Sequence, residues 1–255
     1  MDLRKLNVRS LAIETTRRCN MQCEHCMRGD AQNKDMSMET LDRLFRRLGN
    51  ILEIVPTGGE PSLNPGCLKD ITTCLKRYTR ANADGVYLVT NGAAITQEFV
   101  MNLLELFLQT EMMDEVCGVT VSEDIYHDGD NRKGKDLLSL LAFYRPYDKT
   151  IDWDKTYMLS IGRGAECNSP KKHDAYIDNG LEYACVDNNG DIDLPETTLS
   201  LTVDGDLLPY GDYAYEDVPD IKICNVYEPD WFDKLTDAIY EKSEQLLPER
   251  VKPAS

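Results

Sequence analysis

Short apolar segments and amphipathic segments alternate along the first two thirds of the chain. Five apolar segments have the length and composition of buried strands. They are residues 10–14, 51–55, 86–89, 116–121 and 157–161. Between them, apolar residues recur at three- and four-residue spacing, which predicts helices. The expected helices are residues 38–48, with Ser37 as N-cap and Gly49 as the end, then 65–78, 99–107 and 137–144.

Strands that alternate with helices in this way predict right-handed βαβ units and a parallel sheet. Each of these strands ends in a polar loop that contains glycine. In parallel barrels the active site is built from the loops at the carboxyl ends of the strands. We therefore expect the five loops to converge on one pocket.

After about residue 165 the pattern changes to short strands and tight turns. The strands expected there are residues 181–186, 199–203 and 207–210. Asn189-Gly190 and Asp204-Gly205 are typical of two-residue hairpin turns. Residues 231–246 carry apolar positions at helical spacing and predict a C-terminal amphipathic helix.

The composition narrows the class of protein. With 255 residues, of which 42% are hydrophobic and 29% charged, the chain is globular and fits one large domain or one domain with a smaller appendage. It has no run of about 18 apolar residues, and its polar start lacks the apolar centre of a signal peptide. We expect a cytoplasmic protein without a membrane segment.

The net charge of −17 comes from 45 acidic and 28 basic residues. Such a field repels phosphate groups, which argues against nucleic acid and anionic membranes as partners. A neutral or cationic substrate, or a basic peptide, fits this charge better. Acidity that only keeps the protein soluble is the alternative interpretation.

Nine cysteines in a chain without a secretion signal favour metal binding over disulfides. Cys19, Cys23 and Cys26 follow the first strand within eight residues. Three such thiolates can hold three irons of a cubane iron–sulfur cluster and leave the fourth iron open. With His25 or a distant cysteine they also suit a structural zinc ion. His25 directly precedes Cys26 and is expected to turn away from the face that Cys23 and Cys26 share.

Three motifs stand at successive strand ends. They are Cys19-xxx-Cys23-xx-Cys26, Gly58-Gly59-Glu60-Pro61 and Thr90-Asn91-Gly92. In this order they resemble the radical S-adenosylmethionine (radical SAM) enzymes over residues of about 10 to 165. Three motifs in register are more specific than any one of them alone. The resemblance implies an α/β fold, namely a partial (β/α)6 barrel. It also implies two cofactors, a [4Fe–4S] cluster and S-adenosyl-L-methionine.

The same resemblance implies roles for single residues. Cys19, Cys23 and Cys26 would hold the cluster, whose open iron would be chelated by the amino and carboxylate groups of S-adenosylmethionine. The residues implied around that cofactor are His25, Gly58, Gly59, Glu60, Pro61, Thr90, Asn91, Ser122 and Arg163. Glu60 would accept a hydrogen bond from the ammonium group, and the glycines would allow close backbone approach. His25 would act through its backbone at a position where the family usually has an aromatic residue, and Arg163 would pair with the carboxylate.

The activity implied is radical chemistry. An electron donor such as flavodoxin or ferredoxin would reduce the cluster, and cleavage of S-adenosylmethionine would give a 5′-deoxyadenosyl radical that abstracts hydrogen from a substrate. For the four residues Thr90, Asn91, Ser122 and Arg163, a role as ordinary polar loop residues is the alternative.

The tail carries a weaker resemblance. Residues 202–210, with Cys185 before them, resemble the SPASM or twitch extension that carries auxiliary clusters in peptide-modifying relatives. That extension has a cysteine where Tyr210 stands here. We therefore expect residues 1–165 to form the radical SAM core and residues 166–255 to form an extension that has kept its hairpin and helix but lost its metal.

This extension and the acidic surface point first to a peptide or protein substrate. A small metabolite, such as a nucleoside or a sugar, is the second hypothesis, and a zinc-stabilised interaction protein is the alternative without catalysis. Cys167 and Cys185 are candidates to donate a hydrogen atom to a substrate radical, although their pattern favours a structural role for both.

Overall fold

The computed structural model describes residues 4–124, 126–127, 134–147, 158–167, 172–173 and 181–250. Its main feature is one sheet of eight strands in the order β10-β9-β8-β1-β2-β3-β4, with β7 paired to β8. The strands are β1 (Leu6–Thr16), β2 (Leu48–Gly58), β3 (Asn82–Thr90), β4 (Gly118–Val121), β7 (Cys185–Val186), β8 (Ile192–Leu201), β9 (Asp206–Leu208) and β10 (Cys224–Asn225). Strands β1 to β4 pair in parallel, as the alternation of strands and helices predicts.

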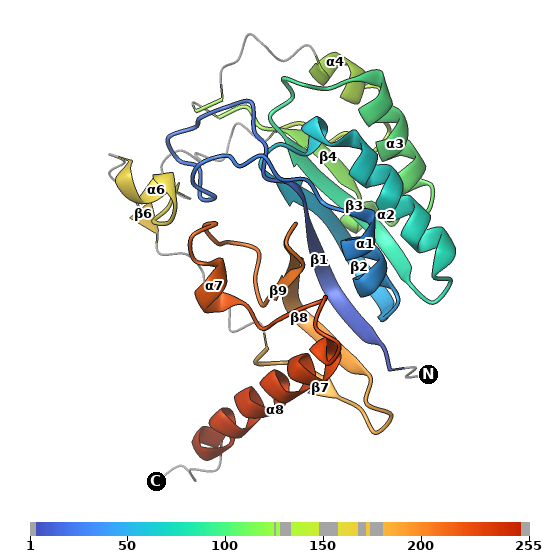
Figure 1. Cartoon of the computed structure of the whole chain (residues 1–255). Helices are drawn as coiled ribbons and strands as arrows, with labels where there is room; N and C mark the ends of the chain where they lie inside the picture. Colours follow the sequence, from blue (N-terminus) through green and yellow to red (C-terminus); the bar gives the residue numbers. More distant parts are fainter. Residues whose placement is uncertain are drawn as a thin grey trace.

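Three helices cover one face of this sheet (Figure 1). They are α1 (Met38–Phe45), α2 (Pro65–Arg77) and α3 (Gln97–Phe107). Ser37 caps α1 as predicted, because its hydroxyl accepts a hydrogen bond from the Thr40 N–H at 3.0 Å. Thr96 caps α3 in the same way. The apolar faces of these helices and of the strands form one continuous core, in which Leu11, Ile54 and Phe99 are fully buried.

The tail extends the sheet on the other side of β1. Strand β8 runs parallel to β1 and pairs with it from Leu6↔Ile192 to Ile13↔Leu201. The predicted turn at Asp204-Gly205 is confirmed, since it joins β8 to the antiparallel strand β9. The predicted C-terminal helix is α8 (Trp231–Arg250). The tail is therefore continuous with the core sheet, which the sequence pattern did not predict.

Several predicted boundaries are wrong for physical reasons. Gly49 does not end the first helix, because Leu48 already pairs with Leu6 and draws the following residues into β2. The helix predicted at 137–144 is the short α4 (Gly134–Leu138), after which the chain forms turns. Strand β7 covers only the last two residues of the predicted segment 181–186.

The fifth predicted strand does not join the parallel sheet in the described residues. Strand β5 (Met158–Leu159) pairs instead with β6 (Lys172–His173) in a separate two-stranded sheet. The fold is thus an unclosed, parallel-rich α/β barrel. The remaining elements are η1 (Pro61–Leu63), η2 (Asp114–Val116), α6 (Arg163–Glu166) and α7 (Val218–Ile221). Within the described ranges, no helix combines the length and the apolar character needed to cross a bilayer.

Candidate functional site

The cysteine loop leaves the carboxyl end of β1 and continues to α1. Cys19, Cys23 and Cys26 are partly exposed, and none forms a disulfide. Burial raises the pKa of the Cys19 thiol, and the nearby negative charges of Glu60, Cys23 and Cys26 add to this. The three thiols and the Glu60 carboxylate are therefore close enough for their charges to interact.

The spacing of the thiols bears on which metal group they suit. Among the described residues, the three cysteine sulfurs do not form a set within 4.8 Å of one another, whereas the ligand atoms of His25, Asp124 and His127 do. A tetrahedral zinc with Zn–S bonds of about 2.3 Å would bring its sulfurs to roughly 4 Å. Because these three free thiols are more widely spaced than that, they fit a larger metal cluster better than a single zinc ion.

The Gly58-to-Pro61 motif packs closely against the residues that begin the cysteine loop. Gly58 has a φ of +128°, and a Cβ at Gly58 or Gly59 would overlap the carbonyl oxygens of Thr16 and Arg18, respectively. The Gly59 and Glu60 N–H groups donate to those same carbonyls at 2.7 and 2.8 Å. The two glycines are thus needed for close approach of two segments of this chain to each other.

The Glu60 carboxylate joins the second and third motifs. It is only 2% exposed. Its Oε1 accepts from the Ser62 N–H at 3.0 Å, the Ser62 hydroxyl at 2.6 Å and the Thr90 hydroxyl at 2.5 Å. Its Oε2 accepts from the Asn91 N–H at 2.8 Å. Among the described residues Oε2 accepts one hydrogen bond and Oε1 accepts three, so Oε2 is the oxygen with capacity for a further donor.

The third motif also reaches the cysteine loop. The Asn91 side-chain amide donates to the Asn20 side-chain oxygen at 2.8 Å, and Asn20 lies directly after Cys19. Ser122, at the end of β4, donates its backbone N–H to the Thr90 carbonyl at 2.9 Å. The loops after β1, β2, β3 and β4 therefore converge at one edge of the sheet, as the sequence predicts. Pro61 begins η1 and is buried beside them.

Arg163 holds the cysteine loop from the side of α6. Its backbone N–H donates to the Cys26 carbonyl and its Nε donates to the Cys23 carbonyl, both at 3.0 Å. Its Nη1 pairs with Asp30 at 3.1 Å. The guanidinium thus fixes the cysteine loop itself, and its contact with a cofactor carboxylate stays a prediction.

The side chain of His25 belongs to a cluster that the sequence reasoning missed. Its ring lies 4.4 Å from the Tyr126 ring and 5.4 Å from the His127 ring, between centroids. His127 Nδ1 is 2.6 Å from the Asp124 carboxylate. Burial lowers the pKa of His127, but hydrogen bonds to Asp124 and Cys23 outweigh it and raise that pKa to about 9. The Asp124-x-x-His127 spacing after β4 was the available signal.

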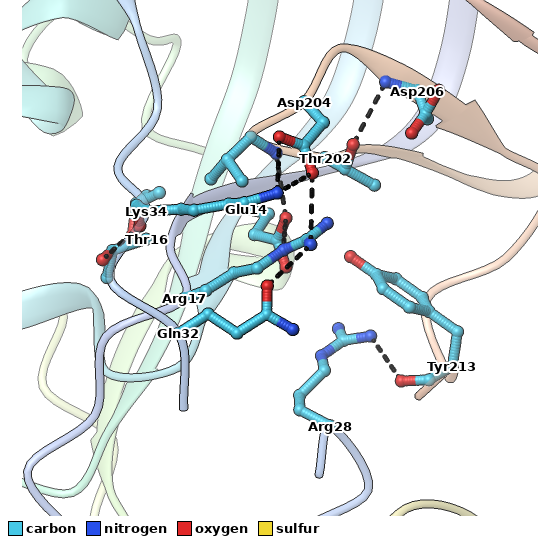
Figure 2. A network of polar contacts seen from close by, with 12 residues as sticks. Glu14, Thr16, Arg17, Arg28, Gln32, Lys34, Thr202, Asp204, Asp206 and Tyr213 are labelled. Atoms are coloured by element: carbon cyan, nitrogen blue, oxygen red, sulfur yellow. Dashed lines mark hydrogen bonds and ion pairs between the residues drawn. The ribbon is translucent and has the colours of Figure 1, made fainter. Parts of the chain in front are cut away.

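A buried ionic network ties the tail to the base of the cysteine loop (Figure 2). Glu14 and Arg17 are 1% and 4% exposed, and Arg17 Nε donates to Glu14 Oε2 at 3.0 Å. The same oxygen accepts from the Val203 N–H at 2.9 Å. Asp204, in the β8–β9 turn, pairs with Arg17 at 3.2 Å and with Lys34 at 2.7 Å. The hairpin turn is therefore fixed to the cysteine loop by charge.

Arg28 makes a second connection between the cysteine loop and the tail. Its Nη1 donates to the Tyr213 carbonyl at 3.0 Å, and its guanidinium lies 3.7 Å from the centre of the Tyr213 ring. The Arg28 carbonyl accepts from the Tyr215 N–H at 3.2 Å. Arg28 is 5% exposed. Sequence reasoning missed Glu14, Arg17 and Arg28, because their importance comes from partners about 185 or more residues away.

The two cysteines proposed as hydrogen donors lie in different places. Cys167 ends α6, and its sulfur lies 3.9 Å from Glu24 in the cysteine loop. Cys185 is exposed and pairs with Asp193, which in turn pairs with Asn7 near the start of β1. At about 3.3 Å per residue, the nine residues from Asn7 to Thr16 place Cys185 roughly 30 Å from the cysteine loop. Cys167 is therefore the nearer of the two candidates to the cysteine loop, and a role of either cysteine as hydrogen donor stays a prediction.

The fold and the site together are an open, parallel-rich α/β barrel with a three-cysteine loop at its strand ends. Residues 13–114 match the family model described as the Radical SAM superfamily. These residues therefore form a Radical SAM domain, and the resemblance stated from the motifs is confirmed for this part of the chain.

Individual relatives share part of the chain. Uncharacterized protein MJ0907 of Methanocaldococcus jannaschii is 29% identical over 142 residues, which are 54% of this chain and 48% of that protein. GTP 3',8-cyclase of Rhodobacter capsulatus is 32% identical over 94 residues, 35% of this chain and 27% of the cyclase. The chain thus spans half or less of the length of these curated relatives.

One solved structure covers nearly all of the chain. The crystal structure of BtrN in complex with AdoMet and 2-DOIA is 19% identical, covers 93% of this chain and 87% of that one, and has a TM-score of 0.51. At this identity the likeness shows the fold alone. It supports the partial barrel fold.

Proposed function

We propose that this protein is a radical SAM enzyme that holds a [4Fe–4S] cluster on Cys19, Cys23 and Cys26 and S-adenosylmethionine beside it. When bound, these groups supply a 5′-deoxyadenosyl radical that abstracts hydrogen from a substrate. The observation that carries the proposal is the convergence of three motif loops at the buried Glu60. Its N–H donates to the Arg18 carbonyl at the start of the cysteine loop, and its carboxylate accepts from Thr90 and Asn91. An electron donor of the flavodoxin or ferredoxin type is part of the proposal.

The chain's own residues would prepare the site for these groups. Arg163 fixes the backbone of the cysteine loop at Cys23 and Cys26, so the thiols keep one arrangement. Glu60 Oε2 is the acceptor available for the ammonium of S-adenosylmethionine. Thr90, Asn91 and Ser122 are held at the same edge, and the resemblance implies that they lie beside the cofactor. Pro61, His25 and the two glycines shape the loop around it.

Iron and sulfide analysis of anaerobically reconstituted protein tests the proposal. We expect about four irons and four sulfides per chain, and release of 5′-deoxyadenosine from S-adenosylmethionine after reduction. Cys23→Ala should lose both. Cys185→Ser is the matched control for cluster loading, because its thiol is exposed at the far end of the sheet. One bound zinc without sulfide would refute the proposal.

We also propose that residues 166–255 form an extension without an auxiliary cluster. In the described part of the tail, Cys185 lies on β7 and the buried Cys224 lies on β10, which occupy different parts of the sheet. Eight irons per chain in place of four would contradict this division.

The substrate hypothesis that the sequence places first is a peptide or protein, with a small metabolite second. One observation favours the second. A cavity of about 360 Å³ lies against the sheet and is bounded by Tyr210, Gly211 and Asp212 of the tail. Sites for small molecules have volumes of about 300–1,000 Å³. Comparing deuterium transfer into 5′-deoxyadenosine from labelled peptides and from labelled small molecules would decide between them.

A further inference from the structure

We propose that this cavity binds a small hydroxylated amine, with the ammonium group of the ligand on Glu53 and one of its oxygens on Arg28. This inference rests on the proposed function, because it takes the cavity as the substrate site of the radical enzyme. It adds a substrate class that the radical chemistry by itself leaves open.

The cavity lies on the face of the sheet opposite the helices. Ser10 and Ala12 of β1 alternate with the core residues Leu11 and Ile13, so they point to the other face. Met27 and Arg28, which also line the cavity, follow directly after Cys26. The cavity is thus next to the loop that would hold the cluster, which is where a substrate must lie to meet a radical formed there.

Glu53 is a carboxylate of the cavity wall without a cation bound to it. It stands half-buried on the central strand β2, and its one hydrogen-bond partner in the described part of the chain is the Ser10 hydroxyl at 3.4 Å. Burial raises the pKa of Glu53, while the Ser10 bond and the charge of Arg9 oppose this. Arg9 itself is exposed and pairs with Glu196 at 3.6 Å. A partly desolvated carboxylate of this kind favours a bound cation.

Arg28 offers a donor to the same cavity. Its Nη1 is used by Tyr213, but its buried Nε has no hydrogen-bond partner among the residues that the structure describes. Arg28 lines the cavity, and since buried polar groups are nearly always hydrogen-bonded, its unpartnered nitrogen favours a shift of the side chain towards a ligand oxygen. Asp212 lines the cavity as well, and burial raises its pKa while Arg28 opposes the shift.

The lining as a whole decides the class of ligand. Its ionisable groups are Glu53, Asp212 and Arg28, which leaves one negative charge in excess. Its hydroxyl groups are those of Ser10, Thr57, Tyr87, Thr198 and Tyr210. This lining suits a ligand with one protonated amine and several hydroxyls, such as an amino sugar. It disfavours a nucleoside triphosphate, whose several negative charges would face two carboxylates.

Binding measurements on the reconstituted holoprotein test this inference. The probes are a set of amino sugars and amino cyclitols, each with its neutral parent in which hydroxyl replaces the amine, together with GTP and a lysine-containing peptide. We expect at least one amine to bind ten-fold or more tightly than its neutral parent, by calorimetry or saturation-transfer NMR. Equal binding of the parents, tighter binding of GTP or the peptide, or no binding by any amine of the set would overturn it.

Variants of Glu53 test whether this residue of the cavity wall binds the ammonium group of the ligand. Glu53→Gln should remove the preference for the amine over its parent, whereas Glu53→Asp, which keeps the charge, should retain part of it. Glu196→Gln is the matched control, because Glu196 is an exposed carboxylate on β8. A preference that survives in Glu53→Gln would refute the assignment. Cleavage of S-adenosylmethionine by the same preparations separates the two proposals, since it reports on the cluster and the cofactor site and not on the amine preference of the cavity.

Discussion

Two buried glutamates organise the carboxyl edge of the sheet in different ways. Glu60 is held by neutral donors from Ser62, Thr90 and Asn91, all within 31 residues of it along the chain. Glu14 is held by the charge of Arg17 and by the Val203 N–H, which lies 189 residues away. The first arrangement unites the loops of the recognisable motifs, and the second attaches the tail. The difference predicts distinct responses to substitution, pH and salt.

The largest effect is expected from Arg17→Met, which leaves the buried Glu14 carboxylate without its cation. Breaking one partner of a buried pair costs about 3–5 kcal/mol of unfolding free energy. Urea unfolding measures this loss. The double variant Glu14→Gln/Arg17→Met should recover most of it, because no unpaired charge remains. Arg43→Met, in the exposed pair with Glu39, is the control and should change stability little. An equal loss of stability in Arg17→Met and Arg43→Met would contradict the distinction between the buried and the exposed ion pair.

Glu60→Gln should have a smaller effect on stability than Arg17→Met. The amide keeps one oxygen for Ser62 and Thr90, but its NH2 group would face the Asn91 N–H. A buried donor left without an acceptor costs about 1–3 kcal/mol. Thermal unfolding compared at low and high salt measures the effect, which should change little with salt because the lost bonds come from neutral donors. A strongly salt-dependent loss would contradict the neutral character of this network.

Asp42, a carboxylate outside the Glu60 and Glu14 networks, gives a pH dependence against which those networks can be compared. Burial would raise the pKa of Asp42, but hydrogen bonds from Tyr78, Arg46 and Arg77 outweigh it and lower that pKa from 3.8 to about 2. The folded pKa is depressed, so this stabilisation is present above about pH 4 and is lost as the pH falls towards about 2. Asp42→Asn should therefore be less stable than the wild type at pH 6, with the difference shrinking below pH 4. A difference that is constant with pH would contradict this.

The smallest effect is expected from Asp204→Asn. Asp204 pairs with Arg17 and Lys34 but is 43% exposed, so its loss should cost less than about 1 kcal/mol. Because exposed charges are screened, the difference from the wild type should nearly vanish at about 1 M salt. Chemical unfolding in urea at two salt concentrations checks this. A loss as large as that of Arg17→Met would mean that the turn, and not the Glu14 pair, attaches the tail.

The candidate site was predictable to the extent that its motifs are local. Cys19, Cys23 and Cys26, the Gly58-to-Pro61 loop and Thr90-Asn91 stand directly after strands that their own apolar residues specify. Parallel pairing then brings them together without further information. The parts that were missed depend on contacts between distant segments, as with Arg28 and Tyr213 or with His127 and Cys23.

The sequence by itself determined the α/β class, the parallel strands β1 to β4 and the identity of the cysteine loop, since strand and helix periodicity and short motifs are local properties. Only the tertiary structure decided that β8 pairs with β1, that Cys185 lies far from the loop, and that Glu53 and Arg28 face one cavity. Which strands pair, and which side chains line a cavity, is set by packing and buried charge between segments nearly 200 residues apart. Neither leaves a periodic trace in the chain.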